Sequence, residues 1–387
     1  MTKPSVAIVT PSFSPMIGGI ENYVLGVGRE LVALGHKIYV LTPDSVLGTK
    51  IPVQRELVQG MEVHRVRVAL DFSYRIKLWP ELFNELKSCS PELIHVYSHD
   101  TYALLALLAA RTSETPMVLT TYGPFQSNAD YGMVQSGVFR IYDAVVSPAL
   151  FRGSDLVMMR YPGIASWLVS MGVSRKKLRL EPSGIPLKST GARNGSSFRR
   201  RYGLQGPVVL YLGRVSPQKG VEFAVKGMKA VSMKYPQARL VIIGPDYTGH
   251  SGELKSIAKA LGLDQNIMIL PPMTDEEAQL EALAACDVFV MPSSFEGFSQ
   301  AVMKAMAQGK PVVVTNVGGL PFEIGEGRCG VLCPYGDPEA LGRCVTALLD
   351  DPAAASAMGT EGKARASLFT FDVLAKTISE TYTGLGA

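Results

Sequence analysis

Short apolar runs alternate with longer amphipathic stretches along the whole chain of 387 residues. This alternation is typical of parallel strands that are joined by crossover helices. In the first half we expect strands in "SVAIVTP", "KIYVLTP", "EVHRVRV", "ELIHVYS", "PMVLTTY" and "DLVMMRY", each followed by a helix-length segment. In the second half we expect them in "PVVLYLGR", "ARLVIIGP", "NIMILPP", "DVFVMPS" and "PVVVTNV". The pattern therefore predicts an α/β protein.

A segment rich in proline, glycine and serine, "LEPSGIPLKSTGARNGSS" at residues 180–197, interrupts the alternation. We therefore expect two Rossmann-like domains, each with a doubly wound parallel sheet, over residues 1–185 and 186–370. The length of the chain agrees with two domains. In such sheets ligands bind beyond the carboxyl ends of the strands, so we expect the site in a central cleft that the two domains face.

Composition excludes several classes of protein. Hydrophobic residues make up 47% and charged residues 19% of the chain, as in soluble globular proteins. No apolar run is long enough to span a bilayer, and the first residues read as a buried strand, so we expect a cytoplasmic protein. The five cysteines do not form a disulfide framework, and Cys329 and Cys333 lack partners at zinc-ligand spacing, so we expect no metal site.

The net charge of +4 is too small to indicate nucleic acid binding. Basic residues cluster at 174–179 ("SRKKLR") and 197–203 ("SFRRRYG"), where solvated helix faces are the favoured interpretation. The alternative is peripheral contact with an anionic membrane, at its inner face. The amphipathic segment 72–87 is similarly open to two interpretations, a core-facing helix or a lipid contact.

The first motif is a pair of glycines, Gly18 and Gly19, between the first strand and a helix with an apolar face. Glycines there allow a ligand to approach backbone N–H groups at the positive end of the helix, which suits an anion or a hydroxyl group. A tight turn without a ligand explains the pair equally well. The glycine pair is not part of a dinucleotide fingerprint, because the spacing G-x-G-x-x-G is absent from this motif.

The second motif is "GRVSPQKG", where Gly213 and Arg214 follow a strand and Lys219 precedes the next helix. Two cations at the mouth of a sheet suit a polyanion such as a diphosphate, and two solvated loop cations are the alternative. No Walker sequence accompanies them, which disfavours a P-loop enzyme.

The third motif is "PSSFEGFSQAVMKAMAQG", a polar loop that leads into a helix capped by Gly309. Glu296 lies beside the helix N-terminus, with free N–H groups expected at Gly297, Phe298 and Ser299. A carboxylate next to backbone donors suits a polyol, and helix capping by Glu296 is the alternative.

The order of these motifs, followed by "KPVVVTNVGGLPFEI", resembles the retaining family 4 (GT4) glycosyltransferases of the GT-B fold over essentially the full chain. The resemblance implies transfer of a sugar from a nucleotide-diphosphate donor to a small-molecule, glycan or lipid-linked acceptor. It also implies that residues 371–387 return to the first domain. Members of this family need neither a metal nor another cofactor, and the chain has no D-x-D triplet.

The resemblance gives each motif a role. Gly18 and Gly19 would lie against the donor diphosphate and the acceptor side. Arg214, preceded by Gly213, and Lys219 would neutralise the diphosphate as it leaves, which agrees with electrostatic stabilisation of the transition state. Glu296 would hold sugar hydroxyls, and the N–H groups that follow it would serve the sugar and phosphate.

Two positions depart from the pattern of the family. Lys304 stands where the family has a second glutamate that holds the ribose, and a cation does not accept hydroxyl hydrogen bonds. Tyr122 stands where many members carry a histidine near the 6-position of the sugar. His95 and His99 either face the acceptor or are buried structural residues, and burial is favoured.

Three functions are compatible with these departures. The first is an active glycosyltransferase that uses a nucleotide sugar. The second is a transferase with another diphosphate donor such as phosphoribosyl pyrophosphate, whose extra phosphate would contact Lys304. The third is a sugar-nucleotide-binding protein without catalysis, which the retention of Glu296, Arg214 and Lys219 disfavours.

Overall fold

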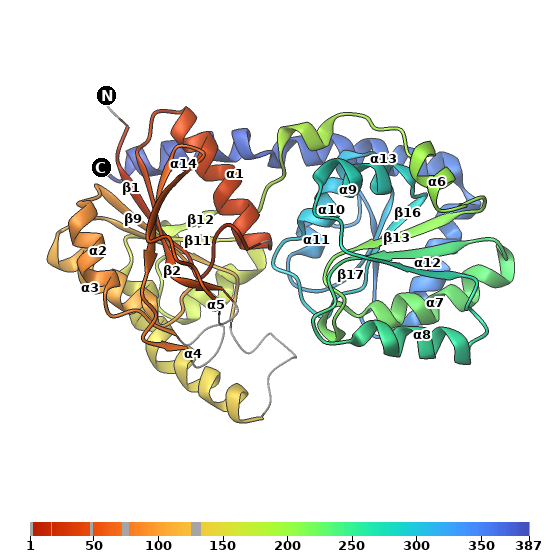
Figure 1. Cartoon of the computed structure of the whole chain (residues 1–387), viewed down its shortest axis with the longest axis horizontal. Coiled ribbons are helices and arrows are strands. Elements are labelled where there is room, and N and C mark those ends of the chain that lie inside the picture. The colour runs from red at the N-terminus through yellow and green to blue at the C-terminus, as the bar shows by residue number, and fades with distance from the viewer. Residues whose placement is uncertain (1–2, 17, 47–48, 72–76, 125–132, 387) are drawn as a thin grey trace. The chain divides into compact units, whose positions relative to one another are not determined.

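The computed structural model describes residues 3–16, 18–46, 49–71, 77–124 and 133–386. The described chain forms two compact units (Figure 1). The N-terminal unit extends to Gly184 and also contains the last segment of the chain, from Phe371 onward. The C-terminal unit runs from Ile185 to Thr370. The chain first crosses from the N-terminal to the C-terminal unit within the proline- and glycine-rich segment at 180–197.

The N-terminal unit is built on an eight-stranded sheet in the order β12-β11-β10-β9-β1-β2-β6-β5. All neighbouring strands are parallel except β5 and β6. The strands of this sheet are β1 (Val6–Val9), β2 (Ile38–Pro43), β5 (Arg55–Val58), β6 (Met61–Val66), β9 (Leu93–Tyr97), β10 (Met117–Thr121), β11 (Leu156–Met159) and β12 (Leu178–Leu180).

Helices cover both faces of this sheet, because strands that are buried on both faces need cover on each. Ala7 and Val9 of β1 belong to one core cluster with residues of the helices α2 to α5. On the other face α1 packs against α14, and a side chain at Gly26 would collide with the ring of Phe371. The bounds are α1 (Gly19–Ala33), α2 (Leu82–Cys89), α3 (Tyr102–Thr112), α4 (Met133–Gly153), α5 (Ala165–Ser170) and α14 (Phe371–Gly384).

One stretch of the N-terminal unit departs from the predicted alternation. Instead of a helix, short strands follow β2, and β5 returns as an antiparallel edge strand beside β6. The turn between β5 and β6 has positive φ at both Gln59 and Gly60, as the favoured two-residue hairpin turn requires. The remaining short strands are β3 (Ser45–Val46), β4 (Thr49–Lys50), β7 (Leu70–Asp71) and β8 (Lys77–Leu78).

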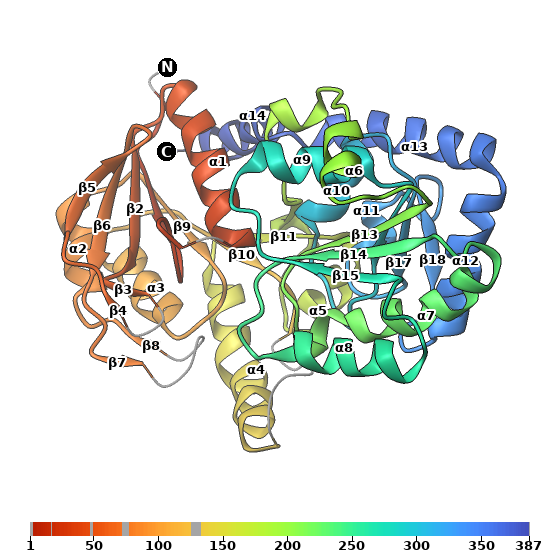
Figure 2. The ribbon, with the colours of Figure 1, turned by 45° about the vertical axis from the view of Figure 1, so that its right-hand side comes forward.

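The C-terminal unit is built on a six-stranded parallel sheet in the order β15-β14-β13-β16-β17-β18 (Figure 2). Its strands are β13 (Val208–Leu212), β14 (Arg239–Ile243), β15 (Ile267–Leu270), β16 (Val288–Met291), β17 (Val312–Thr315) and β18 (Val331–Cys333). Its helices are α6 (Ser196–Arg201), α7 (Val221–Lys234), α8 (His250–Ala260), α9 (Glu276–Ala285), α10 (Gln300–Ala307), α11 (Leu320–Glu323), α12 (Pro338–Asp350) and α13 (Pro352–Ala366).

The predicted fold class is confirmed, since every apolar run that we expected to be a strand lies in one of the two doubly wound sheets. The predicted stop of α10 is also found, with Gly309 at a φ of +69°. In the described part of segment 72–87, Trp79, Leu82 and Leu86 are buried, so the core-facing interpretation holds there. Among the described residues no helix is both long and apolar enough to cross a membrane.

Candidate functional site

The chain order of the C-terminal sheet reverses between β13 and β16. The chain moves outward from β13 through β14 to β15 and then returns to β16, which pairs with the other side of β13. A crevice forms at the carboxyl ends of strands where such a reversal occurs. Arg214 and Lys219 follow β13, and Glu296 follows β16. The fold therefore brings the second and third motifs to one edge of the sheet.

Lys219 and Glu296 form a direct ion pair at this edge. The distance from Lys219 Nζ to Glu296 Oε1 is 2.5 Å, and the two side chains are only 13% and 12% exposed. Ser293 Oγ donates a second hydrogen bond of 3.0 Å to the same oxygen. Among the described residues the other oxygen, Glu296 Oε2, has no hydrogen-bond donor. The carboxylate is thus held through one oxygen and presents the other.

Glycines fix the backbone on both sides of this pair. Gly220 has a φ of +61°, and a side chain there would come within 2.2 Å of the carbonyl oxygen of Pro292. A side chain at Gly318, whose φ is +55°, would come within 2.1 Å of the carbonyl oxygen of Glu296, which also accepts the Gly319 N–H at 2.8 Å. Gly318 was not singled out from the sequence, although the pair of glycines in "NVGGLPFEI" is its signal. These contacts explain why the two loops approach so closely.

Arg214 is exposed, and its guanidinium makes no hydrogen bond or ion pair within the described parts of the chain. Its backbone is nevertheless anchored, because its carbonyl oxygen accepts the Tyr211 hydroxyl at 2.6 Å. The preceding Gly213 packs against Gly244, where any side chain would overlap the Gly213 carbonyl oxygen. This contact requires a glycine at position 244, and Arg214 is a cation on a fixed backbone.

The loop after Glu296 offers two backbone donors instead of the predicted three. Within the described structure the N–H groups of Gly297 and Phe298 have no acceptor. The Ser299 N–H was expected to be free, and this prediction is wrong, since it donates to Glu323 Oε2 at 2.9 Å. Ser299 is also the N-cap of α10, with its hydroxyl accepting the Val302 N–H, so helix capping is not the role of Glu296.

Glu323, which sequence reasoning missed, is fully buried beneath this loop. Burial raises the pKa of its carboxyl group well above the usual range. Its Oε2 accepts the Ser299 N–H and so helps to hold the start of α10. The only signal in the sequence is a single acid at the end of "GGLPFEI".

Lys304 has its own partners inside the C-terminal unit. Its ammonium group lies 3.3 Å from Glu276 Oε1 and donates to Gln279 Oε1 at 3.2 Å, and its side chain is only 12% exposed. Burial lowers the pKa of Lys304. Burial also opposes ionisation of Glu276, but its hydrogen bond with Lys188 and the charge of Lys304 outweigh this, so the pKa of Glu276 is lowered. The positive charge of Lys304 is therefore neutralised by Glu276 of α9.

The glycine pair of the N-terminal unit lies at the corresponding reversal, because β1 pairs with β2 on one side and with β9 on the other. A side chain at Gly18 would come within 2.3 Å of the carboxylate of Glu21, which is buried and accepts a hydrogen bond from Ser12. At Gly19 an added methyl group meets no described atom within 4 Å. Glu21 was missed, although its place in the first helical turn signals a stabilising acid.

The two histidines are buried structural residues, as the favoured interpretation predicted. His95 is fully buried and joins the Tyr382 hydroxyl at 2.6 Å to Thr120 Oγ1 at 2.7 Å. His99 is 1% exposed, between Thr121 Oγ1 at 3.2 Å and Asp143 Oδ1 at 3.4 Å. Neither side chain reaches solvent, so the alternative interpretation, in which the two histidines face the acceptor, does not agree with the structure.

His95 should make stability depend on pH. Burial lowers its pKa to about 4 from 6.5, so between these values the unfolded chain binds a proton that the folded chain does not. Stability is therefore lost as the pH falls from 6.5 towards 4. We expect about 2 kcal/mol less unfolding free energy at pH 4.5 than at pH 7 from this residue, measured by urea denaturation. His95→Gln should reduce that pH dependence. If the variant loses as much unfolding free energy between pH 7 and pH 4.5 as the parent protein, His95 is not the group responsible.

Tyr122 belongs to a buried polar cluster that the sequence did not reveal. Its hydroxyl accepts a hydrogen bond of 2.9 Å from Arg160, which is 1% exposed and lies 4.1 Å from the ring centre of Tyr23. Glu181 faces the same group, with its carboxylate 3.8 Å from Arg160 and 2.9 Å from the hydroxyl of Tyr97. An arginine directly after the buried strand β11 and a glutamate directly after β12 were the available signal. Tyr122 is thus fixed by an internal cation.

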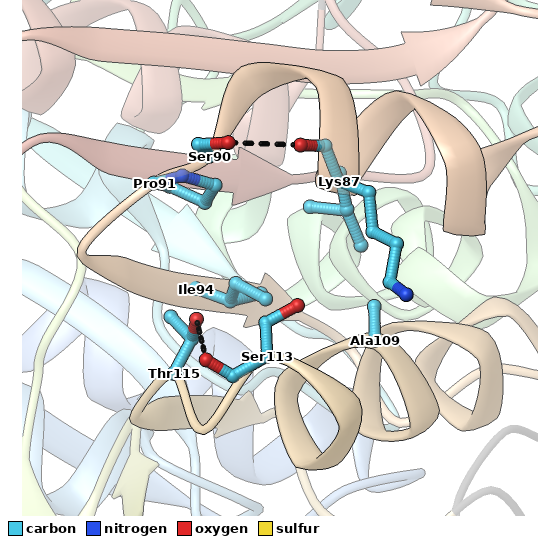
Figure 3. A pocket seen from close by; sticks show the side chains of 8 residues that line it. Lys87, Ser90, Pro91, Ile94, Ala109, Ser113 and Thr115 are labelled. Atoms are coloured by element: carbon cyan, nitrogen blue, oxygen red, sulfur yellow. Dashed lines mark hydrogen bonds between the residues drawn. The ribbon is translucent and has the colours of Figure 1, made fainter.

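A small pocket of about 230 Å³ lies elsewhere in the N-terminal unit, among Lys87, Ser90, Ser113 and neighbouring residues (Figure 3). It is at the amino end of β9, whereas the predicted residues follow the carboxyl ends of strands. None of the predicted site residues lines it. The described residues contain no group of three or more potential metal ligands.

Comparison with solved structures defines the fold. Sucrose-phosphate synthase from Thermosynechococcus elongatus superposes with a TM-score of 0.79 at 22% identity, over 99% of each chain. HepE from Anabaena in complex with UDP superposes with a TM-score of 0.80 at 19% identity, over 98% of this chain and 100% of that one. The protein therefore has the GT-B fold.

Comparison with families gives the class. Residues 17–189 match "Glycosyltransferase Family 4" and residues 197–365 match "Glycosyl transferases group 1". These matches and the two-sheet architecture define a glycosyltransferase of the GT-B type. More particularly, the chain belongs to the family 4 glycosyltransferases, as its resemblance to them predicted.

Individual relatives are distant. The GDP-mannose-dependent alpha-mannosyltransferase of Mycobacterium tuberculosis is 28% identical over 359 residues, which cover 86% of this chain and 85% of that protein. The D-inositol 3-phosphate glycosyltransferase of Streptomyces avermitilis is 30% identical over 219 residues, or 54% of this chain. The match spans only 47% of the length of that second relative.

Proposed function

We propose that this protein transfers a sugar from a nucleotide-diphosphate sugar to a hydroxyl group of an acceptor, with retention of anomeric configuration and without a metal ion. The observation that carries the proposal is the Lys219–Glu296 pair at the chain reversal of the C-terminal sheet. It joins a cation suited to phosphate with a carboxylate suited to sugar hydroxyls. The names of the relatives, which include a GDP-mannose-dependent enzyme and a protein that binds UDP, support a nucleotide donor.

In this proposal the cations of the site act on the diphosphate, and the carboxylate and backbone N–H groups hold the donor. Arg214 and Lys219 stabilise the diphosphate as negative charge develops on it during cleavage of the anomeric bond. Glu296 accepts sugar hydroxyls through Oε2, and the N–H groups of Gly297 and Phe298 donate to the sugar and phosphate. The leaving phosphate oxygen takes the proton of the acceptor hydroxyl, so a second catalytic carboxylate is not required.

The alternative donor, phosphoribosyl pyrophosphate, loses its main support. It required Lys304 to be available for an additional phosphate group, but Lys304 is buried against Glu276 and Gln279. The position therefore holds an internal ion pair instead of an unpaired cation.

Calorimetry with UDP-, GDP-, ADP- and dTDP-sugars and with phosphoribosyl pyrophosphate tests the proposal. We expect binding of at least one nucleotide sugar and slow hydrolysis of that donor, with the same rate in EDTA. Loss of hydrolysis in EDTA would contradict metal independence. Binding without turnover in the presence of acceptors would favour a non-catalytic protein, and no nucleotide-sugar binding would overturn the proposal.

Gly19 offers a test of the glycine motif in the N-terminal unit. An alanine there meets no described atom, so Gly19→Ala should leave the melting temperature unchanged. If a ligand approaches the start of α1 closely, the added methyl group should lower kcat/KM at least tenfold. Gly252→Ala in α8, where an added methyl group is equally unobstructed, is the control. Full activity of Gly19→Ala would show that the glycine pair forms only a turn.

A further inference from the structure

Ser293 lies at the start of the loop that carries Glu296, shortly after the end of β16. Its side chain is fully buried, and its Oγ donates to Glu296 Oε1 at 3.0 Å. A second acceptor, Met291 Sδ, lies 3.3 Å from the same hydroxyl. The hydroxyl has a single proton, and a carboxylate accepts it more strongly than a thioether does. The hydrogen bond to Glu296 is therefore the favoured one.

The backbone around Ser293 is fixed by a neighbouring strand and a neighbouring loop. The Ser293 carbonyl oxygen accepts the hydroxyl of Thr315, at the end of β17, at 2.6 Å. The next residue, Ser294, donates its N–H to the carbonyl oxygen of Gln218 at 2.9 Å. Gln218 directly precedes Lys219, the other group that holds the carboxylate. The two donors to the carboxylate therefore lie on loops that a backbone hydrogen bond ties together.

A glutamate carboxylate turns easily about its last side-chain bond, because the preferences of that torsion are broad. Lys219 alone does not fix the torsion, since an ammonium group is a compact charge that attracts either oxygen. The Ser293 hydroxyl approaches the same oxygen from a second direction. Within the described structure Oε1 thus accepts two hydrogen bonds and Oε2 accepts none. Ser293 therefore holds the carboxylate so that one oxygen stays available to a ligand.

We propose that Ser293 is a positioning residue that orients the Glu296 carboxylate toward the hydroxyl groups of the donor sugar. This inference rests on the proposed function, because it takes the sugar as the ligand of Oε2. Without the Ser293 hydroxyl the carboxylate can turn to share both oxygens with Lys219, and the sugar then loses a fixed acceptor. The diphosphate is held by the charges of Arg214 and Lys219, which this rotation leaves in place. Ser293 therefore acts on binding of the sugar and has little effect on binding of the diphosphate.

Calorimetry with Ser293→Ala tests the proposal, because this substitution removes one oxygen atom and retains the fold. The probes are the UDP-, GDP-, ADP- or dTDP-sugar that the parent protein binds and the same nucleoside diphosphate without its sugar. We expect Ser293→Ala to weaken binding of the nucleotide sugar about tenfold, as loss of a hydrogen bond to a charged group does. Binding of the nucleoside diphosphate should change less than about twofold. The matched control is Ser294→Ala, which should bind both probes like the parent, because its N–H still donates to Gln218.

A double-variant cycle separates positioning of the carboxylate from a general loosening of the loop. In a Glu296→Ala protein, where the diphosphate still holds the donor, adding Ser293→Ala should not weaken binding of the nucleotide sugar further. Additive losses in the cycle, equal losses for the two probes, or parent-like binding by Ser293→Ala would overturn this inference and leave the proposed function standing. If the parent protein binds no nucleotide sugar, the proposed function fails and the inference fails with it.

Discussion

Replacing Arg214 by glutamine is expected to lower kcat at least a hundredfold while leaving the melting temperature unchanged. The guanidinium is exposed and unpaired in the described structure, so its removal breaks no contact of the fold. A factor of one hundred is about 2.7 kcal/mol, the usual effect of removing one group that stabilises developing charge. Steady-state rates with a saturating nucleotide sugar, together with thermal unfolding of both proteins, provide the measurement.

The control for Arg214 is Arg201→Gln, which removes another exposed arginine of the same unit and should retain the full rate. Lys219→Ala is a less clean test, because it also leaves the Glu296 carboxylate without its cation. If Arg214→Gln keeps the rate of the parent protein, the assignment of the diphosphate to this loop is wrong.

Replacing Lys304 by glutamate should destabilise the protein by about 2–3 kcal/mol. The new carboxylate would stand beside Glu276 at a site that is only 12% exposed, and breaking a buried ion pair is costly. The exposed Lys188 continues to neutralise Glu276, which keeps the loss at the lower end of the usual range. Urea denaturation monitored by circular dichroism measures the change.

Two further variants separate this effect from a general effect of charge. Lys255→Glu makes the same change at an exposed position of α8 and should leave stability within about 0.5 kcal/mol. Adding Glu276→Gln to Lys304→Glu removes the repulsion between the two carboxylates. The double variant should recover most of the lost unfolding free energy. A Lys304→Glu protein as stable as its parent, with tighter binding of nucleotide sugars, would show instead that Lys304 is a tolerated deviation at a ribose contact.

Local patterns were sufficient for the strands expected from apolar runs and for α10, because these depend on the spacing of apolar residues and on a glycine stop. The edge strands β12 and β18 were not predicted. The region after β2 was mispredicted, since a Gln-Gly hairpin turn gives a weaker signal than Asn-Gly. Pairings across long sequence distances were also out of reach. Lys219 and Glu296 are 77 positions apart in the sequence, and Lys304 pairs with Glu276 on another helix. Only the packing of the folded unit creates these contacts.

The same limit explains the errors at single groups. The Ser299 N–H looked free because helix termini leave such donors unsatisfied, and the buried Glu323 that takes it lies 24 positions away. Arg160 and Glu181 look unrelated in sequence, yet they share one cluster around Tyr122. Sequence spacing located the loops that carry the candidate site, and tertiary contacts decide which of their groups remain available.

The return of the last helix affects the order in which the protein matures. The last helix makes several contacts with the N-terminal unit. The Tyr382 hydroxyl forms a hydrogen bond with His95, and Ser379 Oγ forms one with His36. Phe371 fills the gap beside Gly26. The N-terminal unit is therefore synthesised first but receives its last structural parts only after the ribosome has passed residue 370. Until then the outer face of α1 lacks its cover, whereas the C-terminal unit is continuous in sequence and does not wait for distant segments. We infer that the unit made first is completed last.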